Sequence, residues 1–498
     1  MGNIALAAQF ENLRAKKIVD DRGVERISPA MSMLEADATL RHVNLGTLLG
    51  EELLGTTNAT FHFGGVSSKS GVRGQLRAEV ASLEFNNADY SNLWLAGNID
   101  NKSFSGELSS EESPFDFALE GKADLNGEKP VYDFRLKVAD ADLNAMNINK
   151  RDSVSHVSFD AELYAVGRNL DEMSGTLDIS NGVYRYNADT LSTNTIRLIS
   201  QSSEERRQLN FNSDYAEATF TGSTSYADLG SYMKSAMQKY LPNLATEKDL
   251  YISQEDEQGG YSALALKVKN IDPLLSAIAR DVHIADGSRL NFTMNPITNH
   301  ILLRAESEYV ELRNTLIANL DIDVTNQGDS LAMYVQSEDL YMGAAHLPQL
   351  SVMGSAKNNR VVMSAGFGDK ENEFNGGVSI MARLRRVEPK HNPQVDVYIS
   401  PSTINTGKKQ WRITSNGITI DSARIVVDNF MVRSAHQMLK LDGVASRHSS
   451  DSLRVEMRDF EIEPFMGFPL RLGYSVKGLA SGEATMQAAL NRGELEAD

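Results

Sequence analysis

The chain has 498 residues, of which 23% are charged and 41% hydrophobic, a composition typical of folded proteins that excludes a disordered chain. Its 49 basic and 67 acidic residues give a net charge of −18, which argues against nucleic-acid or anionic-membrane-surface binding. It contains no cysteine, so disulfides, thiolate metal sites and cysteine nucleophiles are excluded. The nearest basic cluster, Arg383, Arg385 and Arg386, is short, and we expect it to form a solvated strand edge.

The chain carries no sign of a membrane span or of an internal boundary. No stretch approaches the roughly 20 consecutive apolar residues of a spanning helix, and the first residues lack the basic and apolar regions of a signal peptide. Only 12 prolines are present, without a linker that would separate domains. The chain stops at Asp498 just after a new strand begins. We therefore expect an internal piece of a longer protein, built as one continuous array over residues 1–498.

A short phrase recurs four times along the chain. It has a hydrophobic residue, two polar or small residues, a second hydrophobic residue, then Asp, Asn or Glu and a short apolar turn. The copies are Leu40–Leu49, Val138–Asn147, Val268–Leu275 and Met457–Met466. Three copies are followed by alternating apolar residues and glycines: Phe61, Phe63, Gly65, Gly74; Leu163, Ala165, Gly167, Gly175; and Tyr474, Val476, Gly478, Gly482. A phrase at long intervals predicts one unit built repeatedly, with approximate sub-units 1–137, 138–267, 268–456 and 457–498.

Alternation of apolar and polar residues dominates the segments between the phrases. This pattern predicts antiparallel strands with one apolar and one wet face. Turn signals such as Asn86-Asn87, Asn181-Gly182, Asn358-Asn359 and Asn416-Gly417 separate the strands and favour a meander. So large a sheet has to roll, split or bend. Residues expected to point toward its apolar interior are Leu76, Val80, Phe117, Leu119, Phe134, Leu136, Met333, Val335, Val397 and Val427.

Helical spacing is confined to three short segments, near residues 47–55, 228–241 and 273–280. Asp228 is a candidate N-cap and Pro242 a stop for the second helix, whereas Pro273 stands early in the third. Two of the three follow a copy of the phrase. We expect each helix to cover an end or the inner face of the sheet. The Asp, Asn or Glu of the phrase is expected to cap the turn that follows.

Patterns that carry chemistry are largely missing. The 9 histidines form no HExxH helix or other tight metal pair. Asp140–Asn144 begins like a calcium loop, but Ala145 stands where that loop requires glycine and Arg151 where it requires glutamate. No GxSxG elbow occurs. We therefore expect no catalytic residue, no cofactor and no metal, and a protein that is not an enzyme.

Two longer stretches join the phrase in carrying a family resemblance. They are Leu170–Tyr186 with Leu209–Leu244, and Trp411–Leu453. Together these segments resemble the AsmA-like superfamily, and within it the TamB (translocation and assembly module) family of Bacteroidetes-type bacteria. The resemblance implies an elongated, U-shaped or taco-like β-groove with an apolar interior and a polar outside. It also implies a protein of the Gram-negative periplasm, anchored in the inner membrane by an N-terminal helix and meeting a BamA-like outer-membrane protein through a C-terminal domain, both outside this chain.

The sequence thus predicts an all-β fold, an elongated curled antiparallel sheet with few short helices. The leading hypothesis is a non-enzymatic conduit that moves phospholipid or another apolar cargo between the two membranes, or that assists outer-membrane protein assembly. The same side chains could instead fill a packed sandwich or a β-helix. Two other functions stay open, a carbohydrate-active β-helix or β-sandwich enzyme with catalytic carboxylates, and an adhesion-type scaffold.

Overall fold

The computed structural model describes residues 2–13, 16–19, 25–28, 31–69, 71–112, 114–244, 260–295, 297–298, 300–342, 345–368, 371, 374–386, 393–461, 478–490 and 494–497. Chain contacts divide it into two compact units. The first is Met1–Glu204 with Gln208–Asp214, and the second is Glu205–Arg207 with Tyr215–Asp498. Each unit is described by itself.

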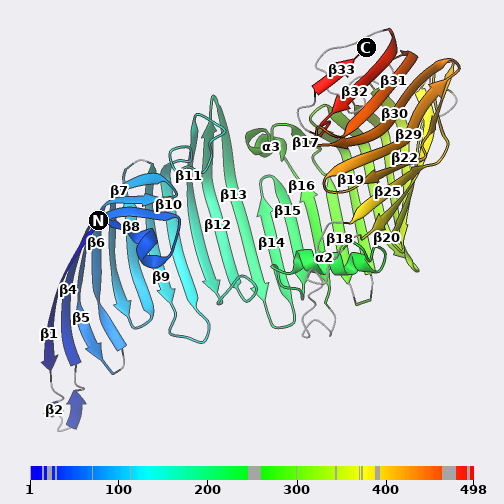
Figure 1. Cartoon of the computed structure of the whole chain (residues 1–498). Helices are drawn as coiled ribbons and strands as arrows, with labels where there is room; N and C mark the ends of the chain where they lie inside the picture. The colour runs from blue at the N-terminus through cyan, green and yellow to red at the C-terminus, as the bar shows by residue number, and fades with distance from the viewer. Residues whose placement is uncertain are drawn as a thin grey trace. The chain divides into compact units, whose positions relative to one another are not determined.

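The chain is all-β, as the alternation predicts. Of the described strands, 31 belong to one antiparallel sheet, and the short strands β2 and β3 pair with each other. In the second unit the sheet curls partly into a ring (Figure 1). The expected curled antiparallel sheet with few helices is therefore confirmed.

Strands of the first unit form a meander in which neighbours in sequence are neighbours in space (Figure 1). β1 pairs with β4, and each strand from β4 to β12 pairs antiparallel with the next. The strands are β1 (Asn3–Leu13), β2 (Lys16–Val19), β3 (Glu25–Ser28), β4 (Met31–Asn44), β5 (Leu54–Ser68), β6 (Gly71–Phe85), β7 (Ala88–Asp100), β8 (Ser103–Ser110), β9 (Phe115–Asp124), β10 (Val131–Asp142), β11 (Ser155–Val166), β12 (Ser174–Tyr186), β13 (Asp189–Ser202) and β14 (Arg207–Ser213).

The second unit continues the antiparallel pattern with one split. At the split, two short strands lie end to end along one long strand: β25 and β26 along β24, and β27 and β28 along β29. The strands before the split are β15 (Ala216–Gly222), β16 (Ser262–Val268), β17 (Val282–Ile284), β18 (Arg289–Asn295), β19 (His300–Leu312), β20 (Thr315–Gln327), β21 (Ser330–Met342), β22 (Ala345–Lys357), β23 (Arg360–Phe367) and β24 (Phe374–Arg385). Those after it are β25 (Gln394–Ile399), β26 (Ser402–Thr406), β27 (Lys409–Thr414), β28 (Gly417–Ile420), β29 (Arg424–Ser434), β30 (Gln437–Ser446), β31 (Ser452–Glu461), β32 (Leu479–Gln487) and β33 (Glu494–Ala497).

The recurring phrase places a β-bulge near the end of a strand. In β4 the residues Arg41 and His42 stand opposite the single residue Asn58, and the pairing resumes at Val43. Because a bulge adds one residue, Leu40 and Val43 point to the same face although they are three residues apart. The freed amide of His42 donates to Asn58 Oδ1 at 2.9 Å. The three-residue spacing of hydrophobic residues is therefore the signature of the bulge.

Two other copies of the phrase repeat this bulge. In β10 the pairing with β11 shifts between Val138 and Ala141, and in β31 the pairing with β32 shifts between Met457 and Phe460. The amide of Asp459 donates to Ser481 Oγ at 2.8 Å, as His42 does to Asn58. The remaining copy ends strand β16 at Val268. The end of the fourth copy, residues 462–466, and the predicted repeat residues Tyr474 and Val476 lie outside the described residues.

The predicted sub-unit borders at residues 138, 268 and 457 fall within β10, β16 and β31. The sub-units themselves stay a prediction. Among the turn signals, Asn86-Asn87 and Asn358-Asn359 form tight hairpins in which both residues have positive φ. Asn181-Gly182 was wrongly predicted as a turn, because Asn181 is the extra residue of a bulge inside β12. Asn416-Gly417 separates β27 from β28 on the same side of β29.

Three helices occur among the described residues, close to the predicted segments: α1 (Leu45–Leu49), α2 (Leu229–Gln238) and α3 (Asp272–Ile278). The first is shorter than residues 47–55 because Gly50 adopts a left-handed conformation, with φ 78°, and ends it. Asn44 Oδ1 accepts a hydrogen bond from the amide of Thr47 at 2.8 Å, so the expected cap is present in the first copy of the phrase. Asp142 Oδ1 does the same for Asn144 and Ala145, each at 3.0 Å. Asp228 makes no side-chain cap. The cap expected from Asp272 in the third copy is also absent, because Asp272 is the first residue of α3 and no side chain caps that helix.

Candidate apolar binding surface

One face of the first unit is apolar from strand to strand. Residues opposite each other in adjacent strands point to the same face, and the register pairs Leu108 with Leu119 and Leu119 with Leu136. The same rule places all the predicted lining residues of this unit on that face: Leu76, Val80, Phe117, Leu119, Phe134 and Leu136. Their role as the lining of a groove stays a prediction.

The apolar face of the first unit is only partly withdrawn from water. Phe117 is buried together with Val138 and Ala141, whereas Leu76 and Phe134 are half-buried. Toward β1 the face opens further, where Leu6 and Phe10 are 71% and 70% exposed. Large exposed apolar side chains that adjoin a continuous apolar face are characteristic of binding surfaces.

Phenylalanine rings on this face lie over glycines of neighbouring strands. A methyl group added at Gly74 would lie 2.6 Å from Phe63 Cζ, and one at Gly97 would lie 2.5 Å from Phe104 Cε2. The same relation joins Gly121 to Phe134 Cδ1 at 2.6 Å. An aromatic ring over a glycine compensates for the side chain that glycine lacks. Of these three glycines, Gly74 belongs to the recurring pattern, and its contact with Phe63 gives it a packing role.

The opposite face of the first unit is charged. Arg135 lies between two carboxylates, with Nη1 3.5 Å from Glu120 Oε1 and Nε 3.7 Å from Glu162 Oε1. A hollow of about 850 Å³ lies over this region. Because these side chains pair with each other and are solvated, each pair contributes about 0–1 kcal/mol to stability. The charges keep this face wet.

The second unit also has a continuous apolar face. Met333 lies opposite Val324, and Val335 lies opposite Ile322. Beyond β24, Val397 lies opposite Ile418, which lies opposite Val427. Met333, Val335, Val397 and Val427 therefore share one face, as predicted for the lining.

Helix α2 packs on the apolar face of the second unit. Its buried side chains Tyr232 and Ala236, with Tyr240 and Leu241 just beyond its end, form a cluster with strand residues. The strand members of that cluster are Met294, Ile301, Leu331, Ala356 and Leu384. A second cluster is built around Trp411, which is fully buried and packs edge to face against Phe460, with 5.3 Å between the ring centroids. Helix α2 thus covers part of the apolar face of the sheet.

A pocket of about 500 Å³ lies between α2 and this sheet face. Its walls come from α2 and the residues after it, and from strands β18 to β23. Met333 lines the pocket, together with Met237, Met294 and Met363. The other predicted residues of the unit, Val335, Val397 and Val427, lie outside its lining. The sequence could not reveal the pocket, because it depends on which strands α2 covers.

The outer face of the second unit is not purely polar, which differs from the polar outside that the resemblance implies. Met353, Val362 and Tyr398 are on this face and are 59%, 46% and 44% exposed.

Arg385, expected at a solvated edge, forms a two-pronged ion pair with Asp396, with Nη2 2.7 Å from Oδ1. Arg386 donates to the backbone oxygen of Asn243 at 2.7 Å. Both arginines thus make contacts within the second unit.

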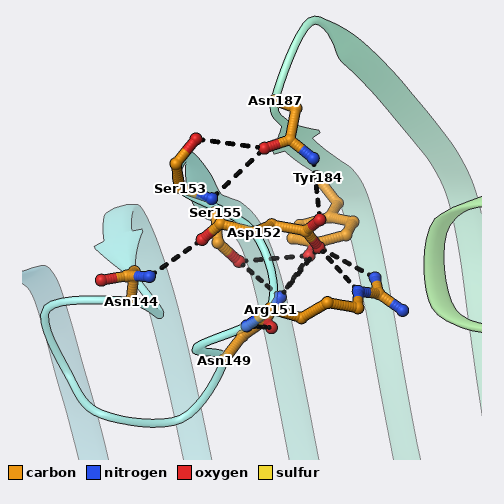
Figure 2. Close-up of polar contacts among 8 residues, drawn as sticks. All are labelled: Asn144, Asn149, Arg151, Asp152, Ser153, Ser155, Tyr184 and Asn187. Carbon is orange, nitrogen blue, oxygen red and sulfur yellow. Dashed lines mark hydrogen bonds and ion pairs between the residues drawn. The ribbon is translucent and has the colours of Figure 1, made fainter.

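A polar cluster of the first unit surrounds the buried carboxylate of Asp152 (Figure 2). Arg151 Nη2 lies 2.8 Å from Asp152 Oδ2, and Asn187 Nδ2 donates to Asp152 Oδ1 at 2.7 Å. Asn149 donates to Asp152 Oδ2 at 3.2 Å and to the Tyr184 hydroxyl at 2.9 Å. The Arg151 guanidinium, with these amides, lowers the pKa of the Asp152 carboxyl to about 2. The cluster ties the loop after β10 to β12.

The residues with metal-binding chemistry form no centre. Among the described residues, no group of three or more His, Asp or Glu side chains is placed to hold a metal ion. His62 Nδ1 lies 2.8 Å from Asp37 Oδ1, and His156 lies beside two carboxylates, with Nδ1 2.9 Å from Asp140 Oδ2 and Nε2 3.9 Å from Asp142 Oδ2. In the described part of the chain, no helix has the length and hydropathy needed to cross a bilayer.

Comparison with known proteins identifies no relative. No protein-family model, no curated protein and no solved structure matches the chain.

Proposed function

We propose that this chain is part of a non-enzymatic conduit of the AsmA-like type, in which the apolar face of each unit carries the acyl chains of phospholipid. The cargo is phospholipid or another apolar molecule that moves between the inner and outer membranes of a Gram-negative cell. The same faces would also suit apolar segments of outer-membrane proteins during their assembly. Anchoring in the inner membrane and a BamA-like partner belong to the proposal as parts of the longer protein.

The observation that carries the proposal is the one-sided register of both units. In each, cross-strand pairing gathers apolar side chains on one face. In the first unit, residues such as Leu76 and Phe134 on that face are only half-buried. Such a face stays available to an apolar ligand, whereas a packed core would withdraw it from water.

A continuous apolar face can supply the free energy needed to keep an acyl chain out of water. Each buried CH₂ is worth about 0.8 kcal/mol, so a chain of about 16 carbons needs roughly 12 kcal/mol of shelter from water. Individual contacts are weak, and the shelter comes from many side chains acting together. A conduit of this kind needs no catalytic residue.

A charge placed on the apolar face tests the proposal. An ionised carboxylate that lacks a partner strongly disfavours an apolar neighbour. We expect Phe134→Asp in the first unit and Val397→Asp in the second each to lower the lipid bound by its unit roughly tenfold, or about 1.4 kcal/mol. The measurement is extraction and mass spectrometry of lipid from protein purified without detergent.

The controls lie on the opposite faces. Tyr164 faces Asp133 across the strands and is 51% exposed, and Tyr398 is the neighbour of Val397 in β25. Tyr164→Asp and Tyr398→Asp should retain the lipid of the unchanged protein. Unchanged lipid in both Phe134→Asp and Val397→Asp would contradict the proposal.

A further inference from the structure

The pocket under α2 is too large to be a packing defect. The pocket is partly open to solvent and measures about 500 Å³. No described side chain fills it. The size falls within the range of about 300–1,000 Å³ found for small-molecule sites.

The walls select for an aliphatic ligand. Apart from Lys234 and the sheet residue Ser355, the residues that line the pocket are apolar or glycine. A ligand with several polar groups would lose its hydrogen bonds to water there and find few replacements. Methionines at positions 233, 237, 294, 333 and 363 line much of the wall. Flexible methionine side chains adapt to ligands of varied shape.

Glycine at position 354 keeps the floor of the pocket open. Gly354 lies opposite Met333 in β21 and Met363 in β23, on the apolar face. A methyl group at this position would lie 3.2 Å from Met333 Cε and 3.4 Å from Met363 Cγ. A larger side chain at Gly354 would therefore project into the space between the two methionines.

The helix that roofs the pocket is fastened at its C-terminal end. The amide of Asn359, in the β22–β23 turn, donates to the backbone oxygen of Tyr240 at 3.0 Å. Asn243 donates through its amide to Asn359 Oδ1 at 2.7 Å and through Nδ2 to the backbone oxygen of Leu384 at 2.9 Å. These bonds hold the segment after α2 against the ends of β22 and β24.

We infer that this pocket is a discrete binding site for a single aliphatic chain, with α2 as its roof and the Asn243 contacts as the fastening. The inference rests on the proposed function, and adds that the second unit holds one chain at a fixed place. The sheet face alone would allow a chain to lie anywhere along it. The roof restricts the site to one chain at a time.

The test uses the 498-residue chain and hexadecanoic acid that carries a diazirine near the middle of its chain. After illumination, mass spectrometry locates the labelled peptides. We expect labels on α2 and on strands β18 to β23, at no more than one probe per chain in that region. Gly354→Leu should reduce this labelling at least tenfold and leave the labelling of β9 and β10 unchanged.

The matched control is Gly366→Leu. Gly366 is in the neighbouring strand β23 and lies opposite Ser351 and Gly377, on the other face of the sheet. The one heavy atom found near a methyl group added there is Gly376 O, at 3.9 Å. This variant should label like the unchanged protein. If Gly354→Leu does not fold, as circular dichroism would show, Met363→Phe narrows the same pocket from β23.

The outcomes separate the two proposals. Labels on β9 and β10 with none around the pocket would overturn the inference and leave the conduit standing. Equal pocket labelling in Gly354→Leu and the unchanged protein would also overturn it. No labelling in either unit would overturn both.

Asn243→Ala removes the hydrogen bond from Asn243 Nδ2 to the backbone oxygen of Leu384. It should raise the rate of probe release several-fold, and an unchanged rate would contradict the role of the fastening.

Discussion

At the scale of single residues, Asp152 shows how a loop of the first unit is held to the sheet. Its carboxylate is buried and accepts hydrogen bonds from Arg151, Asn149 and Asn187, and its pKa lies at about 2 in the folded protein. In an unfolded chain the pKa of aspartate is about 3.9. Because the folded pKa is lowered, the charged form stabilises the fold above about pH 4, and that contribution is lost as the pH falls toward 2.

This sign gives a prediction for Asp152→Asn. The variant should melt at a lower temperature than the unchanged protein at pH 6, because the uncharged amide cannot form the ion pair with the Arg151 guanidinium. The difference in melting temperature should shrink between pH 4 and pH 2, where Asp152 itself becomes neutral. Thermal melts followed by circular dichroism across this range measure it.

Asp133→Asn is the control, because Asp133 is exposed on the charged face of β10. At pH 6 it should melt close to the temperature of the unchanged protein, because its side chain is exposed. A difference for Asp152→Asn that stays constant down to pH 2 would contradict the assigned pKa.

The sequence predicted on which face of the sheet a side chain lies, but not which distant residues it contacts. Alternation identifies which side chains share a face, and all the predicted lining residues follow it, from Leu76 to Val427. The partners of Asp152 come from residues 35 positions away in the case of Asn187, a contact that no local pattern encodes. The position of Phe134 over Gly121 likewise depends on strand register.

At the scale of elements, three copies of the recurring phrase contain a bulge near the end of a strand, and in the first two a side chain, Asn44 or Asp142, caps the turn that follows. The two hydrophobic residues of the phrase, such as Leu40 and Val43, are spaced by three because the extra residue restores the inward direction. The phrase was predictable as a repeat and as a cap. The bulge itself was not foreseen, although the spacing of three within an alternation of two was its signal.

The cap of α1 can be tested by substitution. Asn44→Ala removes the acceptor for the Thr47 amide and should destabilise the α1 turn by about 0.5–2 kcal/mol. Hydrogen exchange of residues 45–50 should become correspondingly faster. Asn44→Asp retains an acceptor and should exchange at nearly the original rate, and equally fast exchange in both variants would argue against the cap.

Helix positions were predictable within a few residues, whereas their contacts were not. Spacing in the sequence gives α2 an apolar side, and Pro242 limits its length. The segment after α2 is bonded to a strand far along the chain, since Asn243 donates to the backbone oxygen of Leu384, 141 residues later. The pocket follows from that long-range packing, and so does the importance of Gly354.

At the scale of the whole molecule, both units use the same construction. Each is an antiparallel sheet with one apolar face, and its opposite face carries charged side chains. The units differ in how the apolar face is treated. In the first unit much of it is half-buried, whereas in the second α2 roofs part of it and leaves a pocket. This difference indicates an open face in one unit and a defined site in the other.

The central claim is that lipid contacts the apolar face and avoids the charged one. Strand β10 tests it most directly, because Tyr132, Phe134 and Leu136 alternate with Asp133, Arg135 and Lys137. A photocrosslinking amino acid introduced at each position in turn should capture lipid with a period of two. The account predicts crosslinks at positions 132, 134 and 136 and none at 133, 135 and 137. Crosslinks of equal strength at all six positions, or at none, would contradict it.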